Sequence, residues 1–187
     1  MEPSLEKTTL LPEAFQTARL QLRRLAPEDA PDMYRYASKE EVAHFLTWDA
    51  HVSIEDSLVT INRLNAGWDT GQAYVFGVIP NGRKGLVGTI GLHFERPWSA
   101  EVGYAVDVPY WGNGYMTEAL IGVLDFARTY FPALYRIEAH HDLLNPASGR
   151  VMEKAGMTYE GIRKAYSHER GPDGRPRDLI MHAIVIR

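Results

Sequence analysis

The sequence Glu101–Leu120, EVGYAVDVPYWGNGYMTEAL, decides the fold, because an apolar strand runs directly into a glycine turn and then into a helix. Gly112 and Gly114 at this junction allow the backbone to bend tightly and to approach a ligand closely. The helix that follows presents unpaired N–H groups and the positive end of its dipole. This arrangement predicts a site where backbone groups bind a phosphate or pyrophosphate. A lone GxG pattern also occurs in ordinary loops, so the prediction depends on the rest of the chain.

The composition is that of an ordinary globular domain. The chain has 187 residues, of which 45% are hydrophobic and 24% charged, and this suits one domain with a substantial core. A formal net charge of −4 disfavours nucleic acid as the main partner, because phosphate-binding surfaces are usually basic. Without cysteine, the chain has no disulfide, thiolate nucleophile or cysteine metal ligand. No apolar run approaches the roughly 18 residues of a membrane span and the first residues lack a signal-peptide pattern, so we expect a cytoplasmic protein with no membrane partner.

Apolar periodicity and turn residues predict the element order β-α-α-β-β-β-α-β-α-β-β. We expect residues 1–18 to be a loosely ordered extension and residues 19–187 to form one domain. The expected helices cover residues 27–38, 53–67, 117–130 and 145–156. The predicted fold class is α/β (α+β): a mixed, mostly antiparallel sheet of six or seven strands, flanked by about four helices.

Two common phosphate-binding motifs are excluded by this order. A Rossmann fingerprint needs GxGxxG after the first strand of a βαβ unit, whereas the glycine turn here follows three consecutive strands and Thr117 stands where the third glycine would be. A GxxxxGK[ST] loop is also absent from the sequence. Neither a dinucleotide nor a nucleoside triphosphate is therefore the expected ligand.

Three segments together resemble the GNAT superfamily of acyl-CoA-dependent N-acetyltransferases, and within it the branch of RimJ/RimL-type ribosomal-protein N-terminal acetyltransferases. They are TARLQLRRLAPEDA near the start, EVGYAVDVPYWGNGYMTEAL in the centre and NPASGRVMEKAGM after the fifth strand. The order and spacing of all three make chance similarity improbable, and the likeness covers most of residues 17–187. It implies a sheet whose two central strands splay apart to bind acyl-CoA.

The resemblance also implies which residues bind acetyl-CoA, here a co-substrate, with no metal involved. Backbone groups of the glycine turn would hold the pyrophosphate of the coenzyme, and the strand before it would pair with the pantetheine arm. The residues of the turn are Trp111, Gly112, Asn113, Gly114, Tyr115, Met116 and Thr117, and those of the strand are Tyr104, Ala105 and Val106. Trp111 and Met116 depart from the family pattern Arg/Gln-x-x-Gly-x-Gly/Ala, and the bulk of Met116 is expected to alter how the helix start meets the diphosphate. Arg150 or Lys154 is a further candidate for a coenzyme phosphate.

Acetyl transfer to an amine needs a neutral nucleophile, a stabilised carbonyl oxygen and a protonated leaving thiolate. By resemblance, the Val106 N–H is the oxyanion donor, and Asn145 reaches the pantetheine or the sulfur, although a plain helix cap explains Asn145 equally well. In many family members a tyrosine protonates the thiolate. Met152 occupies that position here. By resemblance to the RimL-like branch, Ser148, one turn into the helix, is the predicted acid, with a first-turn serine of no catalytic role as the alternative. Glu101 is the predicted base, acting directly or through water, with a solvated edge carboxylate as the alternative.

The sequence indicates the residues that bind the acceptor amine less clearly than those that bind the coenzyme. Phe45 and Trp48 lie in the loop where this family shapes its acceptor pocket, with core packing as the alternative for both. His140 and His141 are adjacent on a strand, so their side chains point to opposite faces and do not share a metal ion. His140 is the predicted substrate-lining histidine and an alternative proton acceptor.

The sequence therefore predicts an acetyl-CoA-dependent N-acetyltransferase acting on a primary amine. An α-amine with a pKa near 8 costs about 1 kcal/mol to deprotonate at pH 7, against about 4.6 kcal/mol for lysine. Because no strong base is evident, a protein or peptide N-terminal α-amine is the favoured acceptor. A small-molecule amine and a non-catalytic acyl-CoA-binding domain are the alternatives. A homodimer formed through the C-terminal hairpin is also possible.

Overall fold

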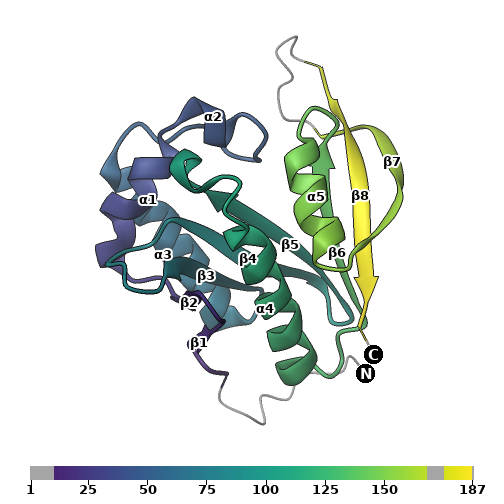
Figure 1. Cartoon of the computed structure of the whole chain (residues 1–187), viewed down its shortest axis with the longest axis horizontal. Coiled ribbons are helices and arrows are strands. Elements are labelled where there is room, and N and C mark those ends of the chain that lie inside the picture. Colours follow the sequence, from purple (N-terminus) through teal and green to yellow (C-terminus); the bar gives the residue numbers. More distant parts are fainter. Residues whose placement is uncertain (1–10, 168–174, 187) are drawn as a thin grey trace.

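The computed structural model describes residues 11–167 and 175–186, and in these residues eight strands form one sheet (Figure 1). The strands are β1 (Ala14–Gln16), β2 (Leu20–Arg24), β3 (Ala73–Pro80), β4 (Gly88–Arg96), β5 (Ser99–Val106), β6 (Arg136–Asp142), β7 (Thr158–Ser167) and β8 (Arg177–Val185). The helices are η1 (Pro27–Asp29), α1 (Ala30–Ala37), α2 (Glu40–Ala43), α3 (Ile54–Thr70), η2 (Val108–Tyr110), α4 (Tyr115–Tyr130) and α5 (Pro146–Lys154). None of these helices is long and apolar enough to cross a lipid bilayer.

The sheet has the strand order β1-β2-β3-β4-β5-β6-β8-β7, and every neighbouring pair is antiparallel except β5 and β6. The parallel pair is short: its register begins at Ser99 opposite Arg136 and ends at Glu101 opposite Glu138. Beyond that point β5 continues to Val106 along β4, and β6 continues along β8. The two central strands therefore diverge, as the resemblance implied.

Helices cover both faces of the sheet, and strand alternation divides the core between them. Phe76 and Val78 of β3 belong to the larger cluster, which contains the apolar residues of α4. Val75 and Ile79 of the same strand belong to the smaller cluster with α1 and α3. All eight residues of β3 are buried as a result. Figure 1 shows α4 and α5 in front of the sheet, on the face that carries the larger cluster.

The fold class is confirmed, with two additions that the sequence did not predict. Residues 14–16, within the expected extension, form β1, whose Phe15 stacks on Phe126 of α4 with ring centroids 5.3 Å apart. Glu40–Ala43 form the single turn α2, too short to show a helical period. These account for the eighth strand and the fifth α-helix.

The helix expected to end near Gly67 continues to Thr70 and ends at Gly71, whose φ of 74° is left-handed. Gly67 serves packing instead of termination, because a Cβ there would lie 3.0 Å from the Cβ of Ala73. A glycine inside a helical pattern and a glycine beyond its end look alike in sequence, so the prediction that the helix ends at Gly67 is wrong.

Two histidines lie between α5 and the sheet, and one of them makes stability depend on pH. His182 of β8 is 2% exposed, and its ring centroid lies 5.4 Å from that of His141. Burial lowers the pKa of His182, and His141 lowers it further, against an opposing effect of Glu153. Below pH about 6.5 the His182 imidazole becomes protonated in the unfolded chain but stays neutral in the folded protein. The free energy of unfolding therefore falls as the pH falls.

We therefore expect the melting temperature to drop by a few degrees between about pH 7.5 and about pH 5.5, and the drop to be smaller in His182→Gln. Thermal unfolding followed by circular dichroism at both pH values measures this. His44→Gln, at an exposed position outside the core, is the matched control and keeps the wild-type drop. An equal drop in His182→Gln and wild type would contradict the assignment.

Candidate active site

The candidate site lies where β5 has lost its partner on one side. Asp107, just beyond β5, donates its N–H toward β4, to the carbonyl of Val87 at 2.8 Å. Facing residues of an antiparallel pair alternate between bonded and non-bonded, so Ala105 directs its backbone groups toward β4 as well. The N–H and C=O groups of Tyr104 and Val106 then point the other way, to the side from which β6 has diverged. Of the three strand residues predicted to meet the pantetheine arm, Tyr104 and Val106 turn their backbone groups to this open edge and Ala105 does not.

The glycine turn connects this open edge to α4. Gly112 and Gly114 have φ values of 75° and 77°, in the left-handed region that favours glycine. The first hydrogen bond of α4 runs from the Glu118 N–H to the Gly114 carbonyl, at 3.1 Å. The N–H groups of residues 115–117 precede that bond and point out of the helix end, where they can bind an anion.

Trp111 has a contact that the sequence did not predict. Its indole N–H donates to the Val106 carbonyl at 2.8 Å, and the Asn113 side-chain amide donates to the Trp111 carbonyl at 3.3 Å. The turn thus folds back onto the end of β5. Because the Val106 carbonyl accepts this hydrogen bond from the indole, the Val106 N–H is the backbone group of that residue that can bind a ligand at the open edge.

The turn is held from outside by Arg19, which lies between β1 and β2. The Arg19 side chain donates to Glu118 at 2.6 Å and to the Asn113 carbonyl at 3.1 Å, and its backbone N–H donates to Glu118 at 2.7 Å. Thr17 adds a hydrogen bond to Glu118 at 2.6 Å. Burial works to raise the pKa of Glu118, but these hydrogen bonds outweigh it and lower the pKa. We call Arg19, Glu118 and Thr17 the turn clamp.

Two further predictions concern the start of α4. The Met116 side chain is 5% exposed and lies in the larger core cluster, so its bulk points into the core, and its effect on the diphosphate contact stays a prediction. A hollow of about 750 Å³ beside α4 is lined by Gly114 and Thr117, and Lys154 of α5 also lines it. The lining of this hollow runs along α4 from Gly114 to Tyr130, so the role of Lys154 as a phosphate ligand stays a prediction.

Tyr104 and Ser148 meet across the gap between β5 and α5. The Tyr104 hydroxyl lies 2.8 Å from the Ser148 hydroxyl and donates to the Ser148 carbonyl at 3.0 Å. Asn145 caps α5, with its side-chain oxygen accepting the Ser148 N–H at 3.2 Å. The cap predicted for Asn145 is confirmed, and it brings Ser148 to the face of the sheet that carries α4 and α5.

Glu101 lies on the opposite face. Its neighbours Ala100 and Val102 belong to the core under α4, so strand alternation directs Glu101 toward the face of α1 and α3. There its carboxylate lies 3.1 Å from Nδ1 of His140. Burial works to raise the pKa of Glu101, but the hydrogen bond and charge of His140 lower it below its ordinary value. The carboxylate is therefore ionised at neutral pH and stabilised by the imidazole.

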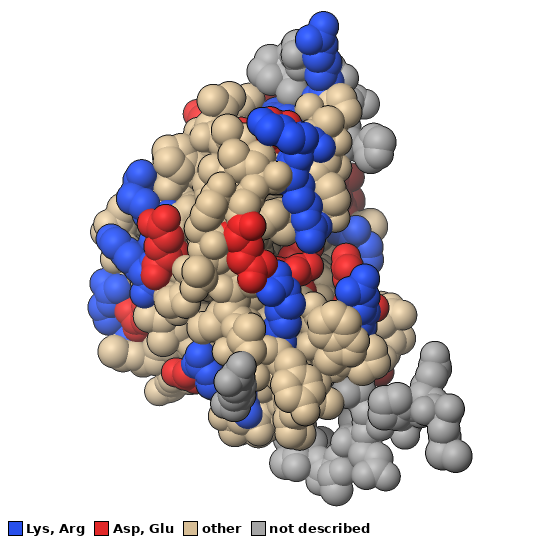
Figure 2. Space-filling view, turned by 90° about the vertical axis from the view of Figure 1, so that its right-hand side faces the viewer, with Lys and Arg blue, Asp and Glu red and all other residues tan. Residues whose placement is uncertain are grey.

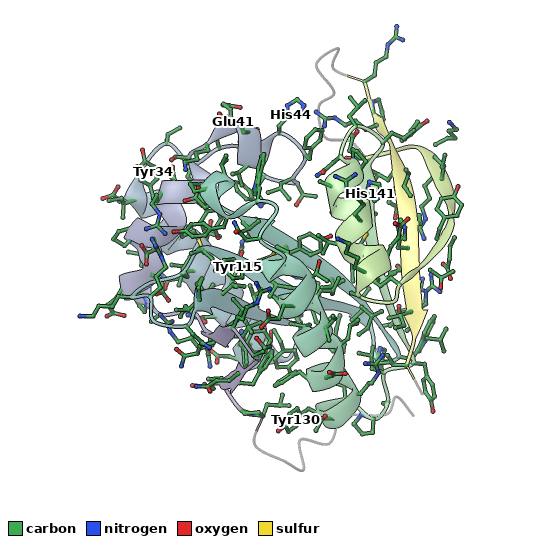
Figure 3. All side chains as sticks on the ribbon, viewed as in Figure 1. Tyr34, Glu41, His44, Tyr115, Tyr130 and His141 are labelled. Atoms are coloured by element: carbon green, nitrogen blue, oxygen red, sulfur yellow. The ribbon has the colours of Figure 1, made fainter. Side chains whose placement is uncertain are left out.

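The predicted acceptor residues Phe45, Trp48 and His140 line one pocket of about 460 Å³, although they come from two distant parts of the chain. Arg177 closes one side of it, donating to the His44 carbonyl at 3.0 Å and to Asp142 at 3.1 Å. Figure 3 shows His44 just beyond α2, at the end of the sheet where β5 and β6 have diverged. Trp48 also packs against the smaller core cluster, so the alternative of core packing holds for it, while its contact with an acceptor stays a prediction.

A buried carboxylate joins the acceptor loop to the glycine turn. Asp107, which precedes η2 and the turn, is 1% exposed. It accepts hydrogen bonds from Lys39, the residue before α2, and from Arg35 of α1 at 3.4 Å. Asp107 therefore links the segment that leads into the acceptor pocket with the segment that leads into the turn.

His141 lies on the other face of β6 from His140, as strand alternation predicts. A Cβ on Gly149 would lie 2.6 Å from its Nε2, which places the ring directly under α5; Figure 3 labels it there. In residues 11–167 and 175–186 no three histidine, aspartate or glutamate side chains gather as metal ligands would.

The basic side chains of the C-terminal hairpin are interspersed with acidic ones. Figure 2 looks onto the β7–β8 side of the molecule and shows blue and red groups next to each other over that face. Lys164 pairs with Asp178 at 2.7 Å, and Arg136 forms an ion pair with Glu160. The hairpin thus presents mixed charge on this face.

Comparison with known proteins places these features in a family. Residues 19–158 match the model of the acetyltransferase (GNAT) domain. The uncharacterized N-acetyltransferase YoaA of Bacillus subtilis is 29% identical over 173 residues, covering 91% of this chain and 96% of that protein.

Two solved structures share the fold. A GNAT-family acetyltransferase from Bacillus anthracis has a TM-score of 0.77 and 27% identity, and the match covers 92% of this chain and 98% of the other. The ribosomal L7/L12 α-N-protein acetyltransferase RimL, solved in complex with coenzyme A, has a TM-score of 0.82 and 20% identity over 93% of this chain and 98% of its own. With a family model that spans most of its length, this chain belongs to the GNAT family of acetyltransferases.

Proposed function

We propose that this protein transfers the acetyl group of acetyl-CoA to a primary amine, and that its natural acceptor is the N-terminal α-amine of a protein or peptide. One observation carries the proposal: β5 parts from β6 after Glu101 and leads, with an open backbone edge, into a left-handed glycine turn at the start of α4. This places a strand edge for an amide-containing arm beside an anion-binding helix end.

The two halves of the site suit the two substrates. The pantetheine arm is proposed to add along Tyr104 and Val106, with the pyrophosphate at the N–H groups of residues 115–117 and Lys154 near the phosphates. RimL, which shares the fold, was solved in complex with coenzyme A, which supports coenzyme A as the ligand. The acceptor amine is proposed to enter the pocket on the opposite face, lined by Phe45 and Trp48.

The proposed chemistry is direct transfer. The neutral amine nitrogen attacks the thioester carbon, the C–N bond forms and the C–S bond breaks, with the electron pair leaving on sulfur. The Val106 N–H stabilises the carbonyl oxygen. Glu101 takes the proton that the amine loses through intervening water, because five strand residues, roughly 16 Å, separate it from Val106, and His140 shares the proton. The Ser148 hydroxyl donates a proton to the sulfur, and solvent restores it.

The choice of an α-amine follows from the base. Because His140 lowers the pKa of Glu101, this carboxylate is a weak proton acceptor. A weak base is sufficient for an amine with a pKa near 8 and insufficient for lysine, where deprotonation at pH 7 costs about 3 kcal/mol more. RimL, as its name states, acts on the α-amine of a ribosomal protein. The same pocket also has room for a small-molecule amine, which is the second candidate.

Thiol release from acetyl-CoA, measured against three acceptor classes, tests the proposal. The classes are short peptides with free N-termini, N-terminally blocked lysine peptides and small polyamines. We expect release with the free α-amines. Release only with polyamines would assign the second candidate. If no acceptor class causes thiol release although calorimetry shows that coenzyme A binds, the result would instead support a binding domain without turnover.

The turn clamp is expected to control coenzyme affinity. Arg19→Ala frees the Asn113 carbonyl and leaves Glu118 without its cation, so the turn must be ordered by the ligand itself. We expect the Kd for coenzyme A to rise about tenfold. Arg128→Ala is the matched control, because Arg128 pairs with Asp125 on the exposed side of the same helix; it keeps the wild-type Kd. An unchanged Kd in Arg19→Ala would show that the turn holds its shape without the clamp.

The base and acid assignments predict different pH profiles. Glu101→Gln is expected to lower kcat/KM by about 10²-fold at neutral pH, and the loss shrinks above pH about 8, where the acceptor amine is already neutral. Ser148→Ala is expected to lower kcat by about 10²-fold without recovery at high pH. Glu95→Gln, an exposed carboxylate on β4, is the control. Wild-type kcat in Ser148→Ala, with the protein folded, would refute its role.

A further inference from the structure

The hydrogen bonds between Tyr104 and Ser148 join strand β5 to helix α5. Tyr104 belongs to β5 and Ser148 to the first turn of α5, 44 residues further along the chain, yet their hydroxyl oxygens lie 2.8 Å apart. The ring of Tyr104 packs against the larger core cluster. A packed ring in a strand holds its hydroxyl at one place, so the position of the Ser148 hydroxyl is set from the sheet as well as from its own helix.

The hydrogens of this pair have two arrangements. In the first, Tyr104 donates to the Ser148 carbonyl, 3.0 Å away, and the Ser148 hydroxyl donates to Tyr104. In the second, Tyr104 donates to the Ser148 hydroxyl oxygen, and the Ser148 proton is free to point elsewhere. A negative charge near Ser148 favours the second, because a hydroxyl that accepts one hydrogen bond becomes a stronger donor in the next.

We propose that Tyr104 is a positioning residue whose hydroxyl donates to Ser148, so that the Ser148 proton is directed to the coenzyme A thiolate as the C–S bond breaks. The inference rests on the proposed function of the site and extends it to a residue whose side chain had no assigned role. Tyr104 keeps its own proton throughout; only the direction of its hydrogen bond changes. Without this hydroxyl, Ser148 is expected to turn its proton back to the Asn145 carbonyl, three residues earlier, which lies 3.2 Å from the Ser148 nitrogen.

The surroundings agree with this role. Met152, one turn beyond Ser148, is 1% exposed in the core, and its thioether has no proton to donate. Burial raises the pKa of Tyr104, so the phenol remains a neutral donor at any pH where the protein is assayed. Asn145 holds the Ser148 N–H from the other side, so the serine hydroxyl is the mobile group of the cluster.

The pKa of the bound coenzyme A thiol tests the proposal without any acceptor amine. The ultraviolet absorbance of the thiolate is followed against pH in the protein complex. Losing one hydrogen bond to the serine oxygen is expected to raise the thiol pKa in Tyr104→Phe by about 0.5–1 unit. In the Ser148→Ala background, Tyr104→Phe is expected to cause no further shift, because its effect passes through the serine. With an active acceptor, kcat falls about tenfold in Tyr104→Phe while the KM for acetyl-CoA stays unchanged.

Tyr74→Phe is the matched control, since Tyr74 is a buried tyrosine of β3 in the same core. It is expected to leave the thiol pKa at the wild-type value. An unchanged thiol pKa in Tyr104→Phe, or a shift of the same size with and without Ser148, would overturn the proposal. If the protein binds coenzyme A but acetylates no amine, the proposed function fails while the thiol titration still decides the role of Tyr104. If it binds no coenzyme A, both are overturned.

Discussion

The structure depends on the early end of pairing between β5 and β6. After Glu101 and Glu138 the two strands share no further register, so each completes its hydrogen bonding with its other neighbour. Backbone groups left without a partner are costly when buried, and the protein offsets this in two ways. The Trp111 indole takes the Val106 carbonyl, and the Tyr104 ring fills the space toward α5. What remains is a strand edge open to a ligand, in the middle of a sheet.

The same divergence puts the two halves of the site on opposite faces. Alternation along β5 sends Tyr104 toward α5 and Glu101 toward the face of α1 and α3. In the proposed function, a thioester lying in the gap would therefore meet the proposed acid from one side and the proposed base from the other. Asp107 connects the two sides. It is buried at the end of β5 and is held by Lys39 and Arg35 from the acceptor side, while the turn that follows it is held by the clamp.

Local signals in the sequence were sufficient to predict much of the secondary structure around the site. Asn145 followed by Pro146 predicts the start of α5, and the strand–glycine–helix order predicts the turn before α4, because caps and left-handed residues act over three or four positions. The partial failures are also local in origin. Gly67 resembles a helix stop but is required by its contact with Ala73, and α2 is a single turn, too short to show a repeating helical pattern. The contacts of Arg19 with Glu118 and Asn113 were missed although all three residues lie in the segments that carried the resemblance. A guanidinium pairing nearly a hundred residues away leaves no periodic signal.

The sequence by itself determined most of the elements, the turn chemistry and the family resemblance, since these depend on neighbours along the chain. Only the tertiary structure decided which groups face the gap. It showed that Met116 points into the core, that Ala105 turns its backbone away from the open edge, that Phe45 and His140 share a pocket, and that the Tyr104 hydroxyl lies on Ser148. Each of these depends on register and on the packing of segments distant in sequence. Register is set by the summed burial of whole faces of the sheet and not by any single residue type.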